Sequence, residues 1–312
     1  MEGEGVMRRG KVFLGVCWAL AFLLLVLLPP AMALAGPGQG AYAELDGHKI
    51  HYISQGRGES VLVLIHGWIC DLEYWRGQIP VLAKNRRVIA LDLIGHGKSD
   101  APHLAYTQEL LARSVLAVMD QAGVGDAVLV GHSMGAAVAR RVALEHPGRV
   151  RALISTDGAL EMPPRDPKDY EPWRRGMAAF AAQFQGPDGQ QKVGPFFDSM
   201  QDKSTPAALR QWVKVRALAT PWHVGRSAME EFVKPDNWDR RPLRLPVLAI
   251  YVPNPDLPPD FEGWLRVLFP DLRCRRINGA GHFVMLEKPK QVSALILDFV
   301  DSPAVRQGKA GK

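Results

Sequence analysis

The chain has 312 residues, 47% of them hydrophobic, and its 38 lysines and arginines against 32 acidic residues give a net charge of +6. A chain of this length can bury a substantial core, and the mild charge, without a run of like sign, excludes a nucleic-acid-binding surface. No cysteine–histidine cluster has zinc spacing and no Gly-x-Gly-x-x-Gly follows a strand pattern, so we expect neither a metal nor a nucleotide cofactor. The expected partner is a small-molecule substrate, and the expected state is a monomer or weak homo-oligomer.

The first 35 residues have the pattern of a secretory signal peptide. Three basic residues precede an uncharged apolar run at Val12–Leu28, and two prolines follow before a small-residue cleavage pattern that ends at Ala35. We therefore expect cleavage after Ala35 and export of the body, to the periplasm or out of the cell. The alternative is a chain anchored in a membrane by residues 12–28, because this run approaches the length that spans a bilayer. Beyond the leader, Cys70 and Cys274 are expected to be free thiols.

After residue 40, strand and helix patterns alternate along the chain. Two runs joined by Asp46-Gly47 predict a hairpin of Ala41–Leu45 and Lys49–Ile53. Short apolar runs predict buried strands at Val61–Ile65, Arg87–Asp92, Ala127–Val130, Val150–Ser155, Val247–Tyr251 and Leu272–Ile277. Helical patterns are found at Tyr74–Lys84, Thr107–Ala122, Ala136–His146, Phe261–Phe269 and Lys288–Val300. Strands that alternate with helices are typical of an α/β fold whose mostly parallel sheet is covered on both faces.

This alternation stops between residues 160 and 235, in a segment rich in proline, glutamine and charge that has no buried-strand pattern. We predict an inserted helical lid, because ligand sites on open α/β sheets lie beyond the carboxyl ends of the strands. The core then comprises residues 36–159 and 236–302, and residues 303–312 form a flexible tail. Most of the lid's aromatic residues are expected to form its own small core, while Trp173 and Trp212 are expected to contact substrate.

A serine lies between the strand pattern at Ala127–Val130 and the helix pattern that begins at Ala136, within Gly131-His132-Ser133-Met134-Gly135. In Gly-x-Ser-x-Gly between a strand and a helix, the serine occupies a sharp, strained turn that exposes its hydroxyl. The two glycines remove Cβ atoms that would collide with the neighbouring strand and helix. The helix N-terminus points its N–H groups at the place where an oxyanion would form. Ser133 is therefore the predicted nucleophile.

A serine hydroxyl needs a general base within hydrogen-bond reach. His282 follows the last predicted strand in a Gly-Ala-Gly loop, at the same sheet edge as Ser133. A glycine-flanked histidine in a loop can turn its ring toward the site, so His282 is the predicted base. His96, in a Gly-His-Gly turn, and His132, beside the serine, are expected to be structural.

Four motifs occur in a characteristic order: His66-Gly67-Trp68, Asp92–Ser99, Gly131–Gly135 and Gly279–Pro289. In this combination, residues 41–302 resemble the α/β-hydrolase superfamily, in its lidded serine esterase-like group. The resemblance implies that Ser133 is the nucleophile and His282 the base. It also implies an oxyanion hole formed by the backbone N–H groups of Trp68 and Met134, with His66 and Gly67 beside the substrate.

The acid that orients the base has two candidates. The superfamily usually places it after the strand Val247–Tyr251, where Asp256 follows, but the usual glycine is missing and Pro253 and Pro255 stiffen the loop. Some relatives carry the acid one strand earlier, where Asp157 stands. Prolines favour an extended path away from His282, whereas Gly158 permits a turn that aims Asp157 inward. We favour Asp157 and keep Asp256 as the alternative.

These residues predict an exported serine hydrolase that cleaves a carboxylic ester, a thioester or an activated amide with an apolar acyl or aryl group. A serine at this position argues against relatives that open epoxides through an aspartate ester. Relatives that cleave carbon–carbon bonds in diketones remain an alternative. So does a ligand receptor that uses a slow hydrolase scaffold.

Overall fold

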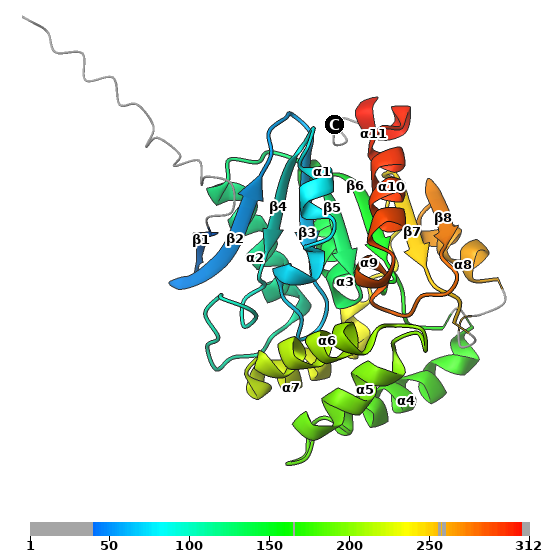
Figure 1. The fold of residues 1–312 in the computed structure, drawn as a ribbon. Helices are drawn as coiled ribbons and strands as arrows, with labels where there is room; N and C mark the ends of the chain where they lie inside the picture. Colours follow the sequence, from blue (N-terminus) through cyan, green and yellow to red (C-terminus); the bar gives the residue numbers. More distant parts are fainter. Residues whose placement is uncertain (1–39, 165, 255–256, 258–259, 308–312) are drawn as a thin grey trace, which may run out of the picture. The chain divides into compact units, whose positions relative to one another are not determined.

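The computed structural model describes residues 40–164, 166–254, 257 and 260–307. The predicted leader and Asp256 lie outside these residues. Eight strands form one sheet in the order β1-β2-β4-β3-β5-β6-β7-β8 (Figure 1). Their bounds are β1 Gly40–Leu45, β2 His48–Gln55, β3 Val61–Ile65, β4 Arg87–Leu91, β5 Ala127–His132, β6 Val150–Thr156, β7 Val247–Tyr251 and β8 Leu272–Arg276. The predicted α/β fold and its mostly parallel sheet are confirmed.

Strand direction follows from the connections. The β1–β2 hairpin turns through Asp46 and Gly47, which both have positive φ, and β2 is antiparallel to β4 as well. Strands β3 to β8 are mutually parallel, and the sequence between consecutive members includes helices. The middle strands are buried along nearly their whole length, which explains their continuous runs of Val, Leu and Ile.

Helices cover both faces of the sheet because the chain crosses in both directions. Right-handed crossovers put α1 (Ile79–Leu82) on one face, and α2 (Gln108–Gln121) and α3 (Met134–Glu145) on the other (Figure 1). The C-terminal α10 (Pro289–Val300) contacts α1, while α2 packs against α3. Thr107 caps α2, and its side chain accepts a hydrogen bond from Leu110 N at 3.1 Å.

The sequence patterns overstated one helix and missed another. The helix predicted at residues 74–84 is instead a 3-10 turn, η1 (Leu72–Trp75), followed by the short α1. Gly77 lies between them, where an added Cβ would stand 2.9 Å from Pro289 Cβ, so the chain bends where it packs on α10. Within the predicted flexible tail, residues 303–307 form α11 (Pro303–Gln307), and Val305 in this helix is buried. An apolar contact therefore orders the start of that tail.

The lid predicted at residues 160–235 is helical and lies between β6 and β7. It contains α4 (Tyr170–Ala182), α5 (Val193–Ser199), α6 (Ala207–Ala219) and α7 (Trp222–Phe232), which run beside one edge of the sheet (Figure 1). The core resumes with β7, α8 (Phe261–Leu268), β8 and α9 (Val284–Glu287). Within the part of the chain that is described, no helix combines the length and apolar character needed to cross a membrane.

A buried ion pair and a hydrogen bond, both made by Arg140, connect the two ends of the lid to α3. Arg140 on α3 lies 3.3 Å from Glu161, where the chain enters the lid, and also donates to the carbonyl of Asp239, where the chain leaves it. Arg240 donates to the carbonyl of Pro163 at 3.1 Å. Burial raises the pKa of Glu161 to about 7, against the opposing effect of Arg140. The two chain segments that connect the lid to the core are therefore held against α3, the helix that follows Ser133.

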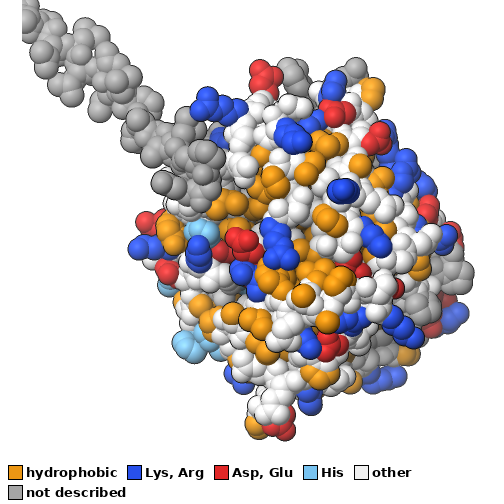
Figure 2. Space-filling view, in the orientation of Figure 1, with side chains coloured by type: hydrophobic (Ala, Val, Ile, Leu, Met, Phe, Trp, Pro, Cys, Tyr) orange, Lys and Arg blue, Asp and Glu red, His pale blue; other side chains and the backbone are white. Residues whose placement is uncertain are grey.

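The surface carries charged side chains of both signs, and the two described cysteines are free thiols. On the face seen in Figure 2, basic and acidic side chains are interspersed with hydrophobic ones. Cys70 is buried and Cys274 half-buried, and both are free thiols, as the sequence predicted.

Candidate active site

The site is built where parallel strands end together. Ile65 pairs with Gly131, His132 with Thr156, and Thr156 with Ile250, so the loops after β3, β5, β6 and β7 leave the sheet at one edge. The sequence placed each proposed catalytic group in one of these loops or in the loop after β8. Backbone geometry therefore brings together segments that are far apart in the sequence.

Ser133 stands at the sharp turn between β5 and α3. Its φ of 52° and ψ of −124° lie outside the regions that ordinary residues favour, so the turn is strained as the motif predicts. An added Cβ at Gly131 would lie 2.4 Å from Ala136 N, and one at Gly135 would lie 2.4 Å from His66 O. Only glycines allow the strand, the helix and the loop after β3 to meet around Ser133.

This crowding predicts a stability difference between two helical glycines. A Gly135→Ala change should lower the free energy of unfolding by about 1–3 kcal/mol, because the new methyl group meets backbone oxygens that cannot easily move. Gly176→Ala in α4 is the matched control, since no described atom outside the backbone of its own helix lies within 4 Å of its added Cβ. That change should raise stability by up to about 1 kcal/mol through helix propensity. Urea denaturation of both variants measures the difference, and equal stability would contradict the close packing around Ser133.

His282 and Asp157 meet through a short hydrogen bond. The ring Nδ1 of His282 lies 2.6 Å from Asp157 Oδ2, and the other carboxylate oxygen accepts from Val252 N at 3.0 Å. Asp157 follows β6 with a φ of 45°, and its own N–H donates to Ile250 O at 2.6 Å. The turn after β6 thus aims the carboxylate at the histidine. With Nδ1 facing Asp157, Nε2 is the ring nitrogen left to act as a base.

The same turn lies against Ser133. Ala159 N donates to Ser133 O at 3.2 Å, and an added Cβ at Gly158 would stand 3.2 Å from Ser133 N. Ser155 Oγ accepts from Gly158 N at 3.1 Å and closes the turn. The structure therefore brings Asp157 together with His282, beside Ser133. The alternative acid, Asp256, lies outside the described residues.

The loop after β3 adjoins Ser133 on another side. An added Cβ at Gly67 would lie 3.0 Å from Ser133 Cβ, so the main chain at Gly67 lies close against the serine. Met134 begins α3, and its N–H therefore has no carbonyl partner within the helix. Met134 is thus the residue next to Ser133, and the oxyanion role of the Trp68 and Met134 N–H groups stays a prediction.

His66 supports this loop instead of facing an open site. Its Nε2 accepts from Leu93 N at 3.0 Å, and its Nδ1 donates to Gly67 O at 2.8 Å. The side chain is fully buried, and burial lowers its pKa, which keeps the ring neutral. The His96 ring lies tilted beside it, with 5.0 Å between the ring centroids, and is also fully buried, with a pKa lowered to about 3 by burial. Both rings brace the loops after β3 and β4.

The aromatic side chains that meet Trp68 come from the lid. Four ring centroids of the lid lie near the centroid of the Trp68 ring: Phe184 at 5.2 Å, Phe197 at 6.0 Å, Phe196 at 6.2 Å and Trp222 at 6.3 Å. Its indole Nε1 donates to Gly225 O on α7 at 2.7 Å. The side chain of the predicted oxyanion residue is therefore part of the contact between core and lid.

Trp173 and Trp212, the two aromatic residues predicted to contact substrate, lie elsewhere in the lid. The ring centroids of Trp173 and Tyr170 are 5.8 Å apart. Those of Trp212 and Tyr74 are 5.1 Å apart, and Arg76 Cζ lies over the Trp212 ring, 3.9 Å from its centroid. Composition could show that the lid is aromatic, but not which rings turn toward Trp68.

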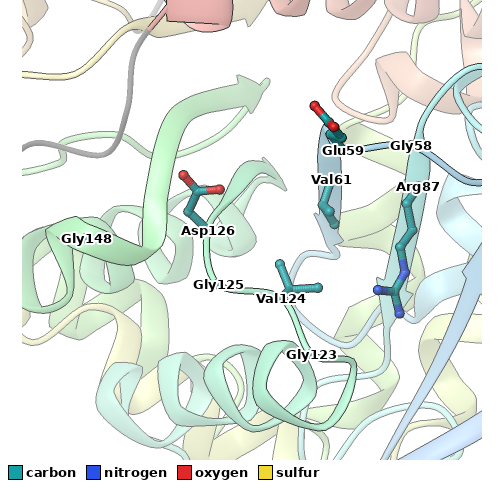
Figure 3. Close-up of a pocket in the computed structure, with 9 residues that line it drawn as sticks. All are labelled: Gly58, Glu59, Val61, Arg87, Gly123, Val124, Gly125, Asp126 and Gly148. Atoms are coloured by element: carbon teal, nitrogen blue, oxygen red, sulfur yellow. The ribbon is translucent and has the colours of Figure 1, made fainter. Parts of the chain in front are cut away.

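A separate hollow of about 550 Å³ lies at the opposite edge of the sheet (Figure 3). Its walls come from residues near the starts of β3 to β6, including Val61, Arg87 and Asp126. Arg87 already donates to Ser54 Oγ at 3.1 Å, and Asp126 pairs with Arg151 at 2.6 Å. The described residues that line it include no serine, cysteine or histidine, so the edge that carries Ser133 is the candidate active site.

The model of the alpha/beta hydrolase fold family matches residues 60–289. The chain belongs to this family. The match includes Ser133, His282 and both lid boundaries, so the α/β-hydrolase resemblance stated from the motifs is confirmed. The strained turn at Ser133 and the Asp157–His282 pair are therefore set in an α/β-hydrolase core.

Individual relatives of this α/β hydrolase are distant and carry different activities. Bifunctional epoxide hydrolase 2 of Mus musculus is 26% identical over 82% of this chain and 54% of its own, so the chain spans about half the length of that relative. The 2-hydroxy-6-oxo-6-(2'-aminophenyl)hexa-2,4-dienoic acid hydrolase of Metapseudomonas resinovorans is 26% identical over 89% of this chain and 98% of its own. Among solved structures, Est816 is described as an N-acyl homoserine lactone degrading enzyme. It has a TM-score of 0.70 and 26% identity, and the match covers 83% of this chain and 100% of the Est816 chain.

Proposed function

We propose that this protein is an exported serine hydrolase that cleaves carboxylic esters with an apolar acyl or aryl group. The observation that carries the proposal is the 2.6 Å hydrogen bond between Asp157 and His282. The turn that contains Asp157 also donates a hydrogen bond to the carbonyl of the strained Ser133. A nucleophile, a base and an orienting acid are the minimum set for acyl transfer through a covalent intermediate. Export rests on the leader pattern of residues 1–35.

In the proposed reaction, Ser133 Oγ attacks the ester carbonyl while His282 Nε2 takes the hydroxyl proton. The backbone N–H groups of Trp68 and Met134 stabilise the oxyanion that forms. His282 then gives its proton to the leaving alcohol, and an acyl group remains on Ser133. Water attacks this acyl-enzyme with His282 again as base, which releases the acid and restores the serine. Asp157 holds the imidazole and stabilises its positive charge throughout.

Two observations support an ester over other substrates. Ser133 occupies the position where an epoxide-opening enzyme would need an aspartate to form an ester intermediate, so the epoxide hydrolase relatives do not supply the chemistry. A lactone is a cyclic ester, and Est816 is described as acting on one. The aromatic contacts between Trp68 and the lid favour an apolar group on the substrate.

Covalent labelling tests this proposal. A fluorophosphonate probe should label the wild-type protein at one residue, and peptide mapping should place the label on Ser133. A series of p-nitrophenyl esters of increasing acyl length should be hydrolysed, with the length preference reporting the size of the acyl site. Labelling at a residue other than Ser133, or no hydrolysis of any ester in the series, would refute the proposal.

The second candidate is hydrolysis of a carbon–carbon bond, favoured by the full-length similarity to the dienoic acid hydrolase from Metapseudomonas resinovorans. It predicts cleavage of a vinylogous diketone with little activity on p-nitrophenyl esters. A ligand receptor built on this scaffold is the third alternative. It would label at Ser133 yet turn over far more slowly than the roughly 10 per second that is typical of enzymes.

A further inference from the structure

His132 lies between the proposed nucleophile and the loop of the proposed base. It is the last residue of β5, directly before Ser133, and its side chain is almost wholly buried. Its Nε2 lies 2.9 Å from the carbonyl oxygen of His282. A carbonyl only accepts, so His132 Nε2 carries the proton and donates it. The two imidazole rings stand 4.7 Å apart, and the His132 ring also contacts Phe283 at 5.7 Å.

The loop that carries His282 needs such a support. It contains Gly279, whose φ of 65° is a conformation that glycine adopts most readily, and Gly281, whose N–H donates to Glu287 Oε2 at 2.8 Å. The hydrogen bond to Asp157 restrains only the ring. The main chain of His282 is held at both polar groups: its N–H donates to Met200 O on the lid at 2.7 Å, and its carbonyl accepts from His132.

We infer that His132 is a positioning residue, which fixes the main chain of His282 relative to Ser133 through its Nε2 hydrogen bond. This inference rests on the proposed function. Because His132 and Ser133 are consecutive, the bond ties the base to the strand that sets the position of the nucleophile. An error of about 1 Å in placing a catalytic group can cost about 10²-fold in rate.

A neutral histidine suits this task. Burial lowers the pKa of His132 well below its ordinary value, and the nearby His282 lowers it further. When His282 takes up the serine proton, His132 therefore stays neutral and does not compete for it. Among the described residues its Nδ1 has no hydrogen-bond partner, and an added Cβ at Gly67 would lie 3.0 Å from it. The ring thus packs against Gly67 in the loop after β3, while its one N–H donates to the carbonyl of His282.

Paired substitutions separate the hydrogen bond from the packing. His132→Gln keeps an amide N–H donor at nearly the same reach, whereas His132→Leu keeps an apolar volume without a donor. We expect the glutamine variant to stay within about fivefold of wild-type kcat, and the leucine variant to lose about 10²-fold in kcat. KM should change little in either, and the rate of fluorophosphonate labelling at Ser133 should fall with kcat. His146→Gln, at the exposed far end of α3, is the control and should match wild type.

Equal losses in the two variants, or a leucine variant within threefold of wild type, would overturn the inference. If the leucine variant does not fold, as judged by its thermal transition, His132→Asn replaces it, because the shorter amide cannot reach the His282 carbonyl. Asparagine should then lose about 10²-fold where glutamine does not, and equal activity of these two would overturn the inference. Failure of the proposed function is seen separately, as wild-type protein that is not labelled at Ser133.

Discussion

Replacement of Ser133 by alanine is expected to lower ester turnover by on the order of 10⁶-fold while the protein stays folded. The hydroxyl is the only group of this side chain that the proposed reaction uses, and alanine removes it without adding volume. The strained backbone of the turn, with φ of 52°, is tolerated by alanine no worse than by serine. Steady-state kinetics on the best p-nitrophenyl ester, with a thermal transition for each protein, measures both parts.

The control for this change is Ser60→Ala. Ser60 directly precedes β3 and therefore lies at the opposite edge of the sheet. It should leave turnover unchanged. Substantial activity in the Ser133 variant would mean that another group attacks the substrate, and the acyl-enzyme route would have to be abandoned. The aromatic lid and the oxyanion loop would then need a different interpretation.

Asp157→Asn is expected to lower turnover by on the order of 10⁴-fold, because the histidine would adopt the wrong tautomer. The asparagine oxygen can still accept the hydrogen bond that Val252 N makes to Asp157 at 3.0 Å. Its amide NH₂ then faces His282 Nδ1 and donates to it. The imidazole proton moves to Nε2, which can no longer take the proton of Ser133. The loss should appear in kcat, with labelling of Ser133 slowed to a similar degree.

Two further aspartates serve as comparisons. Asp126→Asn, at the amino edge of the sheet, should have little effect on turnover, since Asp126 lies far from Ser133 along β5 and pairs with Arg151 at 2.6 Å. Asp256→Asn should remain within about tenfold of wild type, in contrast to the loss of an orienting carboxylate. A severe loss at Asp256 with a mild one at Asp157 would reverse the assignment and make the Asp157–His282 bond a structural contact.

The elements that local patterns specify were found from the sequence alone. Continuous apolar runs predicted β3 and β7 to the residue, because a strand buried on both faces admits only such residues. The sharp turn at Ser133 was equally clear, since Gly131 and Gly135 are required by contacts with the immediate neighbours of Ser133. By contrast, the helix expected over residues 74–84 divides where Gly77 packs on Pro289, a contact across more than two hundred residues.

What the sequence by itself determined is the sheet, the order of its loops and the positions of Ser133 and His282, all of which depend on periodicity and on residues adjacent in the chain. The tertiary structure decided which aspartate meets His282, which rings meet Trp68, and that His132 bonds to the base. Each of these depends on the path of a loop and on the direction of a side chain. Neither is encoded locally: Asp157 faces His282 only because β6 and β7 are paired, so that Ile250 O and Val252 N can hold the turn and the carboxylate in place.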